Sequence, residues 1–141
     1  MIGTGVDIIE LKRIKRMVDR HKNLDRIYTN LELTYIMGKG NRIETYAGIF
    51  AAKEAVVKAL GTGFRGIEWT EIEIDHDEAG KPIALTHGKA AKHVAEEGIR
   101  GISISISHDR IQAIAFAVVW TEEDNEGELK DGKYMENLGR N

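Results

Sequence analysis

Three side chains of this sequence could together hold a divalent cation and a phosphate group: Asp7, Glu54 and Lys58. Glu54 and Lys58 are four residues apart, so they share one face of any helix that contains them. Mg²⁺ prefers one or two carboxylates, with water and phosphate oxygens as its other ligands, and Asp7 with Glu54 would provide that pair. Each residue also has an ordinary alternative. Glu54 and Lys58 could form a surface ion pair worth about 0.3–0.5 kcal/mol, and Asp7 could cap the helix that follows it.

The first carboxylate lies in a segment with the alternation of a β-strand. Over residues 1–8 every second residue is apolar or β-branched, and Asp7 falls on the opposite face together with Gly3 and Gly5. This period is typical of a strand. Glycines beside a carboxylate leave room for a ligand or another backbone to approach it. We therefore expect Asp7 to lie on a strand face that a neighbouring group approaches closely.

The second carboxylate and the lysine lie in the segment with the clearest helical pattern. Residues 45–60 are rich in alanine, and Gly61 follows as a helix-ending residue. Because apolar residues surround Glu54 and Lys58 along this stretch, both charges are expected to emerge from an apolar setting. Residues 61–66 contain three glycines and predict a flexible loop directly after the helix. A half-buried carboxylate and ammonium beside such a loop fit a metal–phosphate site.

The remaining segments predict further helices and strands. Thr29 followed by Glu32 is a capping box that starts a short helix. His108 follows a predicted strand in a turn, and a histidine in such a place more often has a structural role than a ligand-binding one. The serines at 103, 105 and 107 most simply form one polar strand face. The other predicted helices are 9–21, 30–37 and 89–97, and the other strands are 69–75, 83–86, 102–107 and 111–120, the last buried on both faces.

Composition excludes several classes of protein. A chain of 141 residues is long enough for one domain, and 42% hydrophobic with 30% charged residues is an ordinary globular balance. The absence of cysteine excludes disulfides, thiolate metal sites and cysteine nucleophiles. No apolar run approaches the roughly 18 residues that span a bilayer, and the N-terminus does not resemble an export signal. We therefore expect a cytoplasmic protein without a membrane partner.

Charge is distributed unevenly along the chain. Residues 12–26 carry a net charge of +5, whereas residues 122–141 carry a net charge of −4. A basic helix attracts an acidic partner. The hydrophobic pattern stops after Trp120, so we expect a folded domain over residues 1–120 and a poorly ordered acidic tail over residues 121–141.

Four segments, in order, resemble the holo-acyl-carrier-protein synthases, the short type of phosphopantetheinyl transferase. Residues 3–14 (GTGVDIIELKRI) resemble the opening motif of the family, and residues 50–63 (FAAKEAVVKALGTG) resemble its second signature. Residues 80–82 (GKP) and 104–108 (ISISH) match two further segments. The resemblance implies an α+β fold: a single small domain in which an antiparallel-rich sheet packs with a long central helix.

The resemblance also implies a reaction. The family transfers the 4′-phosphopantetheine group of coenzyme A to a serine of apo acyl-carrier protein, in fatty acid biosynthesis, and releases adenosine 3′,5′-bisphosphate. By this resemblance Asp7 and Glu54 hold Mg²⁺, and Lys58 contacts the diphosphate of coenzyme A. The family is typically a homotrimer with active sites at the subunit interfaces. The further residues implied for the coenzyme A site are Gly61, Thr62, Gly63, Phe64, Arg65, Pro82 and His108.

The carrier protein is expected on the basic segment. Carrier proteins of this family are acidic, and the residues implied to receive them are Arg13, Lys12, Arg16 and Arg20. One departure from the family pattern stands beside the second signature, where a basic residue commonly precedes Phe50 and this chain has Ile49. The corresponding contact is then lost, or supplied by a nearby cation: Arg42, Lys53 or Arg65.

The expected catalytic groups are Glu54, Lys58 and Asp7. When a serine hydroxyl attacks a phosphorus, most of the catalysis is positioning and charge neutralisation. We expect Glu54, directly or through a water, to accept the proton of the serine. We expect Lys58 to stabilise charge on the departing phosphate.

Other function classes fit parts of the sequence. A nucleic-acid-binding module would use the basic helix, but the aromatic platform typical of single-strand binders is absent, and we expect no nucleic-acid partner. A metal-dependent phosphoesterase would use Asp7, Glu54 and His108, although such sites commonly gather more carboxylates or histidines around two metals. A purely structural protein leaves the four ordered motifs unexplained.

Overall fold

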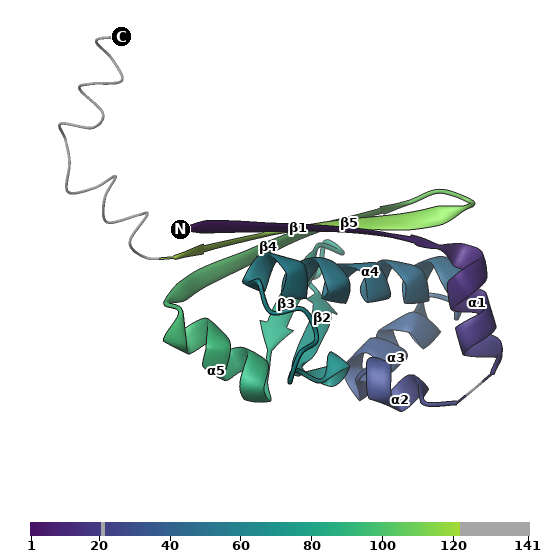
Figure 1. The fold of residues 1–141 in the computed structure, drawn as a ribbon. Helices are drawn as coiled ribbons and strands as arrows, with labels where there is room; N and C mark the ends of the chain where they lie inside the picture. The colour runs from purple at the N-terminus through teal and green to yellow at the C-terminus, as the bar shows by residue number, and fades with distance from the viewer. Residues whose placement is uncertain (21, 122–141) are drawn as a thin grey trace, which may run out of the picture.

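The computed structural model describes residues 1–20 and 22–121, and these form an α+β domain (Figure 1). The order of its elements is β1 (Ile2–Glu10), α1 (Leu11–Asp19), α2 (Leu24–Ile27), α3 (Asn30–Gly38), α4 (Ile43–Leu60), the 3₁₀ turn η1 (Trp69–Glu71), β2 (Ile72–His76), β3 (Pro82–Thr86), α5 (Gly88–Glu96), β4 (Ile99–His108) and β5 (Gln112–Thr121). The expected fold class is confirmed. Thr121 belongs to the last strand, and the rest of the expected acidic tail lies outside the described residues.

Two antiparallel sheets and one long helix make up the centre of the domain. The larger sheet has the strand order β1-β5-β4, and the smaller one pairs β2 with β3. Helix α4 lies along the inner face of the larger sheet (Figure 1). Its buried alanines, Ala47, Ala51, Ala52, Ala55 and Ala59, allow this close packing. The long central helix expected from the sequence is therefore confirmed.

The two glycines before Asp7 allow β1 to lie directly on α4. A side chain at Gly5 would place its Cβ 2.0 Å from the carbonyl oxygen of Ala55, and one at Gly3 would lie 2.3 Å from that of Ala59. Neither distance is sterically possible, so only glycine fits. The group that approaches the first strand is thus the backbone of α4, and Asp7, on the same strand face, is brought against this helix.

The last strand, predicted to be buried on both faces, is buried on only one face within a single chain. Its inner face packs on α4, whereas on its outer face Phe116 is 46% and Ile114 41% exposed. Their register partners on β1, Val6 and Ile8, are 51% and 54% exposed. The reason is that, among the described residues, nothing covers the outer face of this sheet (Figure 1). An apolar run therefore lies half in the core and half on an open surface.

Other element boundaries differ by a few residues from the prediction. The capping box of Thr29 and Glu32 is confirmed at the start of α3, and Gly61 ends α4 in a left-handed conformation with φ 77°. The strand expected from residue 69 begins at Ile72, because residues 69–71 form the 3₁₀ turn. None of the described helices is both long and apolar enough to cross a membrane.

Candidate active site

Asp7 lies on the inner face of β1 and contacts Lys58 of α4. Its Oδ1 is 3.2 Å from the Nζ of Lys58, which also donates a hydrogen bond of 2.9 Å to the carbonyl oxygen of Val6. The other carboxylate oxygen of Asp7, Oδ2, is buried and has no hydrogen-bond partner. A buried, unpaired carboxylate oxygen is costly, because the water it has lost is not replaced. Asp7 therefore has one coordination position unused.

Glu54 belongs to the same site. Its side chain is half-buried on α4, one helical turn before Lys58. Burial raises the pKa of Glu54, and the negative charge of Asp7 raises this pKa further, while Lys58 and Arg13 oppose the rise. Because the charge of Asp7 acts on the pKa of Glu54, we infer that the two carboxylates lie close together. The structure thus brings together Asp7, Glu54 and Lys58, which we call the carboxylate site.

The carboxylate site has the donor set that suits one Mg²⁺ ion. A divalent cation would give Asp7 Oδ2 a partner and offset the repulsion between Asp7 and Glu54. Within residues 1–20 and 22–121, no cluster of three or more histidine, aspartate or glutamate side chains is arranged to hold a metal ion. His108 accordingly does not join the two carboxylates as a third ligand, which counts against the phosphoesterase alternative.

Lys53, the residue before Glu54, has a different environment. It is completely buried, and its Nζ lies 2.6 Å from Oε1 of Glu32, which is equally buried. The same ammonium donates to the carbonyl oxygens of Ile27 and Trp69. Burial raises the pKa of Glu32, and the ammonium of Lys53 opposes that rise. Lys53 is therefore fully occupied and cannot supply the cation that Ile49 lacks.

Three stacked aromatic rings, which we call the aromatic wall, lie beside α4. Phe50 lies one turn before Glu54, and its ring stacks on Trp69 with centroids 4.6 Å apart. Phe64 stacks on the same indole at 3.9 Å. Phe64 belongs to the loop after Gly61, in which Gly63 and Gly66 also have positive φ. The loop expected to bind coenzyme A therefore lies at the end of α4 nearer Lys58.

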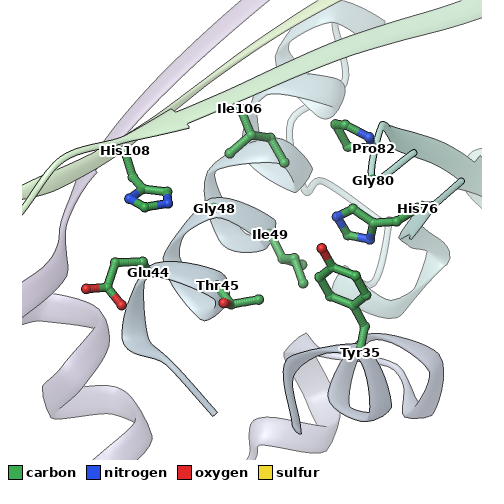
Figure 2. A pocket seen from close by; sticks show the side chains of 10 residues that line it. All are labelled: Tyr35, Glu44, Thr45, Gly48, Ile49, His76, Gly80, Pro82, Ile106 and His108. Carbon is green, nitrogen blue, oxygen red and sulfur yellow. The ribbon is translucent and has the colours of Figure 1, made fainter. Parts of the chain in front are cut away.

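A separate cavity of about 280 Å³ opens near the other end of α4 (Figure 2). Pro82 and His108, both expected at the coenzyme A site, line this cavity together. No residue of the 61–65 segment lines it. The full lining is Tyr35, Glu44, Thr45, Gly48, Ile49, His76, Gly80, Pro82, Ile106 and His108, and we call it the histidine cavity.

The histidine cavity and the carboxylate site face different sides of one helix. Thr45 lines the cavity and Glu54 belongs to the carboxylate site. Nine residues of α-helix rotate the side chain by about half a turn and advance it by about 13 Å. The predicted coenzyme A residues of one chain are thus divided between two places. The division concerns a single chain, whereas the resemblance implies active sites at subunit interfaces.

The basic residues expected for carrier binding lie on exposed faces of α1 and just beyond it. Arg13, Arg16 and Arg20 line one surface groove of about 500 Å³ with Met17. Lys12 is exposed on the same helix. Arg13 also lowers the pKa of Glu54, so the basic face extends to the edge of the carboxylate site. An acidic partner on α1 would therefore lie beside the carboxylate site.

Several residues near these sites were missed by the motifs. Tyr35 and His76 line the histidine cavity, and Trp69 holds the aromatic wall together. They are isolated in sequence, and no spacing rule connects them.

Comparison with known proteins agrees with this geometry. The model of the 4′-phosphopantetheinyl transferase superfamily matches residues 3–115. Holo-[acyl-carrier-protein] synthase of Clostridium kluyveri is 42% identical over 132 residues, which cover 93% of this chain and 98% of that protein.

Solved structures agree as well. Holo-[acyl-carrier-protein] synthase of Neisseria meningitidis has a TM-score of 0.79 at 38% identity, covering 86% of this chain and all of that one (100%). The Helicobacter pylori enzyme in complex with coenzyme A has a TM-score of 0.74 at 32% identity, covering 85% and 100%. The family expected from the four motifs is confirmed: this chain belongs to the 4′-phosphopantetheinyl transferase superfamily, among the holo-[acyl-carrier-protein] synthases.

Proposed function

We propose that this chain transfers the 4′-phosphopantetheine group of coenzyme A to a serine of apo acyl-carrier protein, as a step that supports fatty acid biosynthesis. The serine oxygen forms a bond to the β-phosphorus, and the bond from that phosphorus to the bridging oxygen breaks. Adenosine 3′,5′-bisphosphate leaves with the electron pair. The observation that carries the proposal is the unpaired Oδ2 of Asp7 beside Glu54 and Lys58, in a chain of this family.

Asp7 and Glu54 are the residues that hold Mg²⁺ in this proposal. The unpaired oxygen and the mutual repulsion of the two carboxylates both support a bound divalent cation. The cation, when bound, neutralises charge on the phosphate oxygens. Lys58 forms an ion pair with Asp7 in this structure, and because its side chain is 49% exposed it is also accessible to a diphosphate.

Glu54 is the proposed base for the serine proton. A carboxylate with a raised pKa is a stronger base than an ordinary glutamate, and burial together with Asp7 raises the pKa of Glu54. Lys58 then stabilises the negative charge that develops on the leaving phosphate. The aromatic wall of Phe50, Trp69 and Phe64 provides an apolar surface beside Glu54 for the pantetheine arm.

A homotrimer with shared active sites is part of the proposal. The open outer face of the sheet carries Val6, Ile8, Ile114 and Phe116, and a contiguous apolar patch of this kind marks an interface. The carboxylate site and the histidine cavity face different sides of α4 in one chain. We assign the diphosphate to the carboxylate site of one subunit and the nucleotide to the histidine cavity of its neighbour.

The carrier protein docks on the basic face of α1 in this proposal. Acidic helices are attracted to the groove lined by Arg13, Arg16 and Arg20, chiefly through a faster encounter. Because Arg13 acts on Glu54 electrostatically, a carrier bound there presents its serine near the proposed base.

The test mixes the protein with apo acyl-carrier protein, coenzyme A and Mg²⁺ and follows the carrier by mass spectrometry. We expect one phosphopantetheine group per carrier and an equal amount of adenosine 3′,5′-bisphosphate. Omitting the carrier should leave coenzyme A intact, because no acceptor serine is present. Hydrolysis of coenzyme A without a carrier, or an unmodified carrier, would refute the proposal.

A further inference from the structure

The histidine cavity contains a pair of stacked rings. Tyr35 of α3 and His76 at the end of β2 stack with their centroids 3.6 Å apart and their planes only 2° from parallel. Figure 2 shows both rings on one side of the cavity, with His108 on the opposite side. The Nζ of Lys39 lies 5.7 Å from the centroid of the Tyr35 ring. His76 is therefore held in a fixed orientation at the cavity wall.

The cavity has no permanent positive charge on its wall. Among the described residues that line it, His76 and His108 are the only side chains able to carry a positive charge. Glu44 is its one acidic side chain, and it pairs with Arg42 at 3.5 Å. Ile49, which also lines the cavity, is apolar. Among the described residues that line the cavity in one chain, the two imidazoles are therefore the groups that can offer positive charge to an anionic ligand.

We propose that His76, held against Tyr35, is a specificity-determining residue that binds the phosphomonoester of the donor's nucleotide half and takes up a proton as it does so. This inference rests on the proposed function, since it is coenzyme A that brings a nucleotide 3′-phosphate into the cavity. The face of the Tyr35 ring stabilises a positive charge on the imidazole stacked on it. A charge-assisted hydrogen bond to phosphate then selects the phosphorylated donor.

The surroundings of His76 keep it neutral when the cavity is empty. Burial lowers the pKa of His76, and Lys39 lowers it further, while Asp75 and Asp77 act in the opposite direction. Its Nδ1 is buried without a hydrogen-bond partner, so a proton there gains no acceptor. The other titratable groups around the cavity are Tyr35, Glu44 and His108.

A bound phosphate reverses this balance, because an anion beside the imidazole raises its pKa. The protonated form then binds the donor more tightly than the neutral form does. Affinity is accordingly highest below the pKa of His76 in the empty cavity. It falls as pH rises from that value to the higher pKa of the complex, by at most about tenfold per pH unit for one proton.

The test compares coenzyme A with coenzyme A that lacks the 3′-phosphate, as donors for the wild type and for His76→Gln. We expect the variant to raise KM for coenzyme A about tenfold near pH 6, where a charge-assisted contact of about 1.4 kcal/mol is lost, with kcat unchanged. KM for the donor without the 3′-phosphate should not change. KM should rise with pH more steeply in the wild type than in the variant. The pH dependence that remains in the variant reports the titration of the phosphate itself, and the difference between the two proteins is the contribution of His76.

Matched controls separate this role from a structural one. His87→Gln changes a histidine that pairs with Glu73 and does not line the cavity, and it should leave both KM values and their pH dependence unchanged. Tyr35→Leu should weaken donor binding in the same pH range, because it removes the ring that supports the imidazolium. Melting temperatures show whether each variant folds.

Calorimetry with adenosine 3′,5′-bisphosphate tests the inference without any transfer reaction. The wild type should bind it with proton uptake, seen as a heat that depends on the ionisation enthalpy of the buffer, and His76→Gln should bind it without. Equal proton uptake in both proteins, or an equal loss with both donors, would overturn the role of His76. Failure of transfer together with normal binding would refute the proposed function and leave this inference standing.

Discussion

Two lysines five residues apart on α4 form ion pairs of opposite character. Lys53 and Glu32 are both completely inaccessible, 2.6 Å apart, and surrounded by further hydrogen bonds from α2, η1 and β2. Lys58 and Asp7 are 3.2 Å apart, and their side chains are 49% and 15% exposed. Asp7 keeps one buried oxygen without a partner.

The difference separates structure from function along one helix. A buried ion pair of this kind fixes the elements that it joins and offers little to a ligand, since both carboxylate oxygens and the ammonium already have hydrogen-bond partners. An incomplete pair at the surface retains both charge and an unused acceptor. We infer that Lys53 holds α4 in place and that the neighbouring carboxylate site, with Glu54 and Lys58 on the same helix, performs the chemistry.

The largest expected effect comes from Glu54→Gln. Removing a general base should lower kcat about 10²–10⁴-fold. The raised pKa of Glu54 means that its ionised form is disfavoured in the folded state, so ionised Glu54 lowers stability at pH above its unfolded pKa. The melting temperature without metal should therefore stay the same or rise. A variant that keeps near-normal turnover at saturating Mg²⁺ would show that Glu54 is not the base.

The comparison of the two lysines is tested by Lys53→Met against Lys58→Met. Lys53→Met leaves the buried carboxylate of Glu32 without its positive partner and should lower the free energy of unfolding by about 3–5 kcal/mol. The second breaks a half-exposed pair and should lower it by about 1 kcal/mol or less, yet reduce kcat far more. Urea unfolding and steady-state kinetics measure both quantities.

The double variant Lys53→Met with Glu32→Gln is the control for the buried pair. It removes both charges and should recover part of the lost stability, because no unpaired charge remains in the core. Comparable destabilisation by Lys53→Met and Lys58→Met would contradict the distinction between the two pairs.

Subunit mixing sharpens the contrast between the carboxylate site and the histidine cavity. Glu54→Gln and His108→Ala should each be impaired alone. If the proposed trimer forms, unfolding and refolding the two variants together gives mixed trimers in which some sites combine Glu54 from one subunit with His108 from its neighbour, and activity should be partly regained. Activity that never exceeds the sum of the two separate variants would place both halves of the site in one chain.

The smallest expected effect is a shift in pH dependence. With Glu54 as the base, kcat/KM should rise with pH through the raised pKa of Glu54. The charge of Asp7 is one cause of the raised pKa of Glu54. Asp7→Asn should therefore shift the acidic side of the remaining pH–activity profile to lower pH, by less than about one unit. If the acidic side of the profile does not shift in Asp7→Asn, the two carboxylates do not interact.

The sequence predicted the parts of this molecule that depend on local pattern. The strand with Asp7, the capping box of Thr29, the helix ended by Gly61 and the exposed basic residues of α1 all follow from periodicity or capping chemistry. The serines at 103, 105 and 107 are exposed, as expected of one polar strand face. The family followed from four motifs in order.

The parts that depend on distant contacts could not be predicted. Hydrophobic residues on both faces of β5 indicated burial, because a sequence does not reveal whether a second layer covers a sheet. Nothing in the spacing of Lys53 and Lys58 distinguished the buried pair from the half-exposed one. The stack of Tyr35 on His76 joins residues 41 positions apart that share no motif. The prediction of a cytoplasmic protein stays a prediction.

The most direct measurement of the central claim is a Mn²⁺ titration followed by electron paramagnetic resonance. The wild type, Asp7→Asn and Glu54→Gln are compared at equal concentration, with Lys12→Gln as a surface control outside the carboxylate site. The account predicts one Mn²⁺ ion per subunit in the wild type and the control, and clearly weaker binding in each carboxylate variant. Unchanged Mn²⁺ affinity in both carboxylate variants would contradict it.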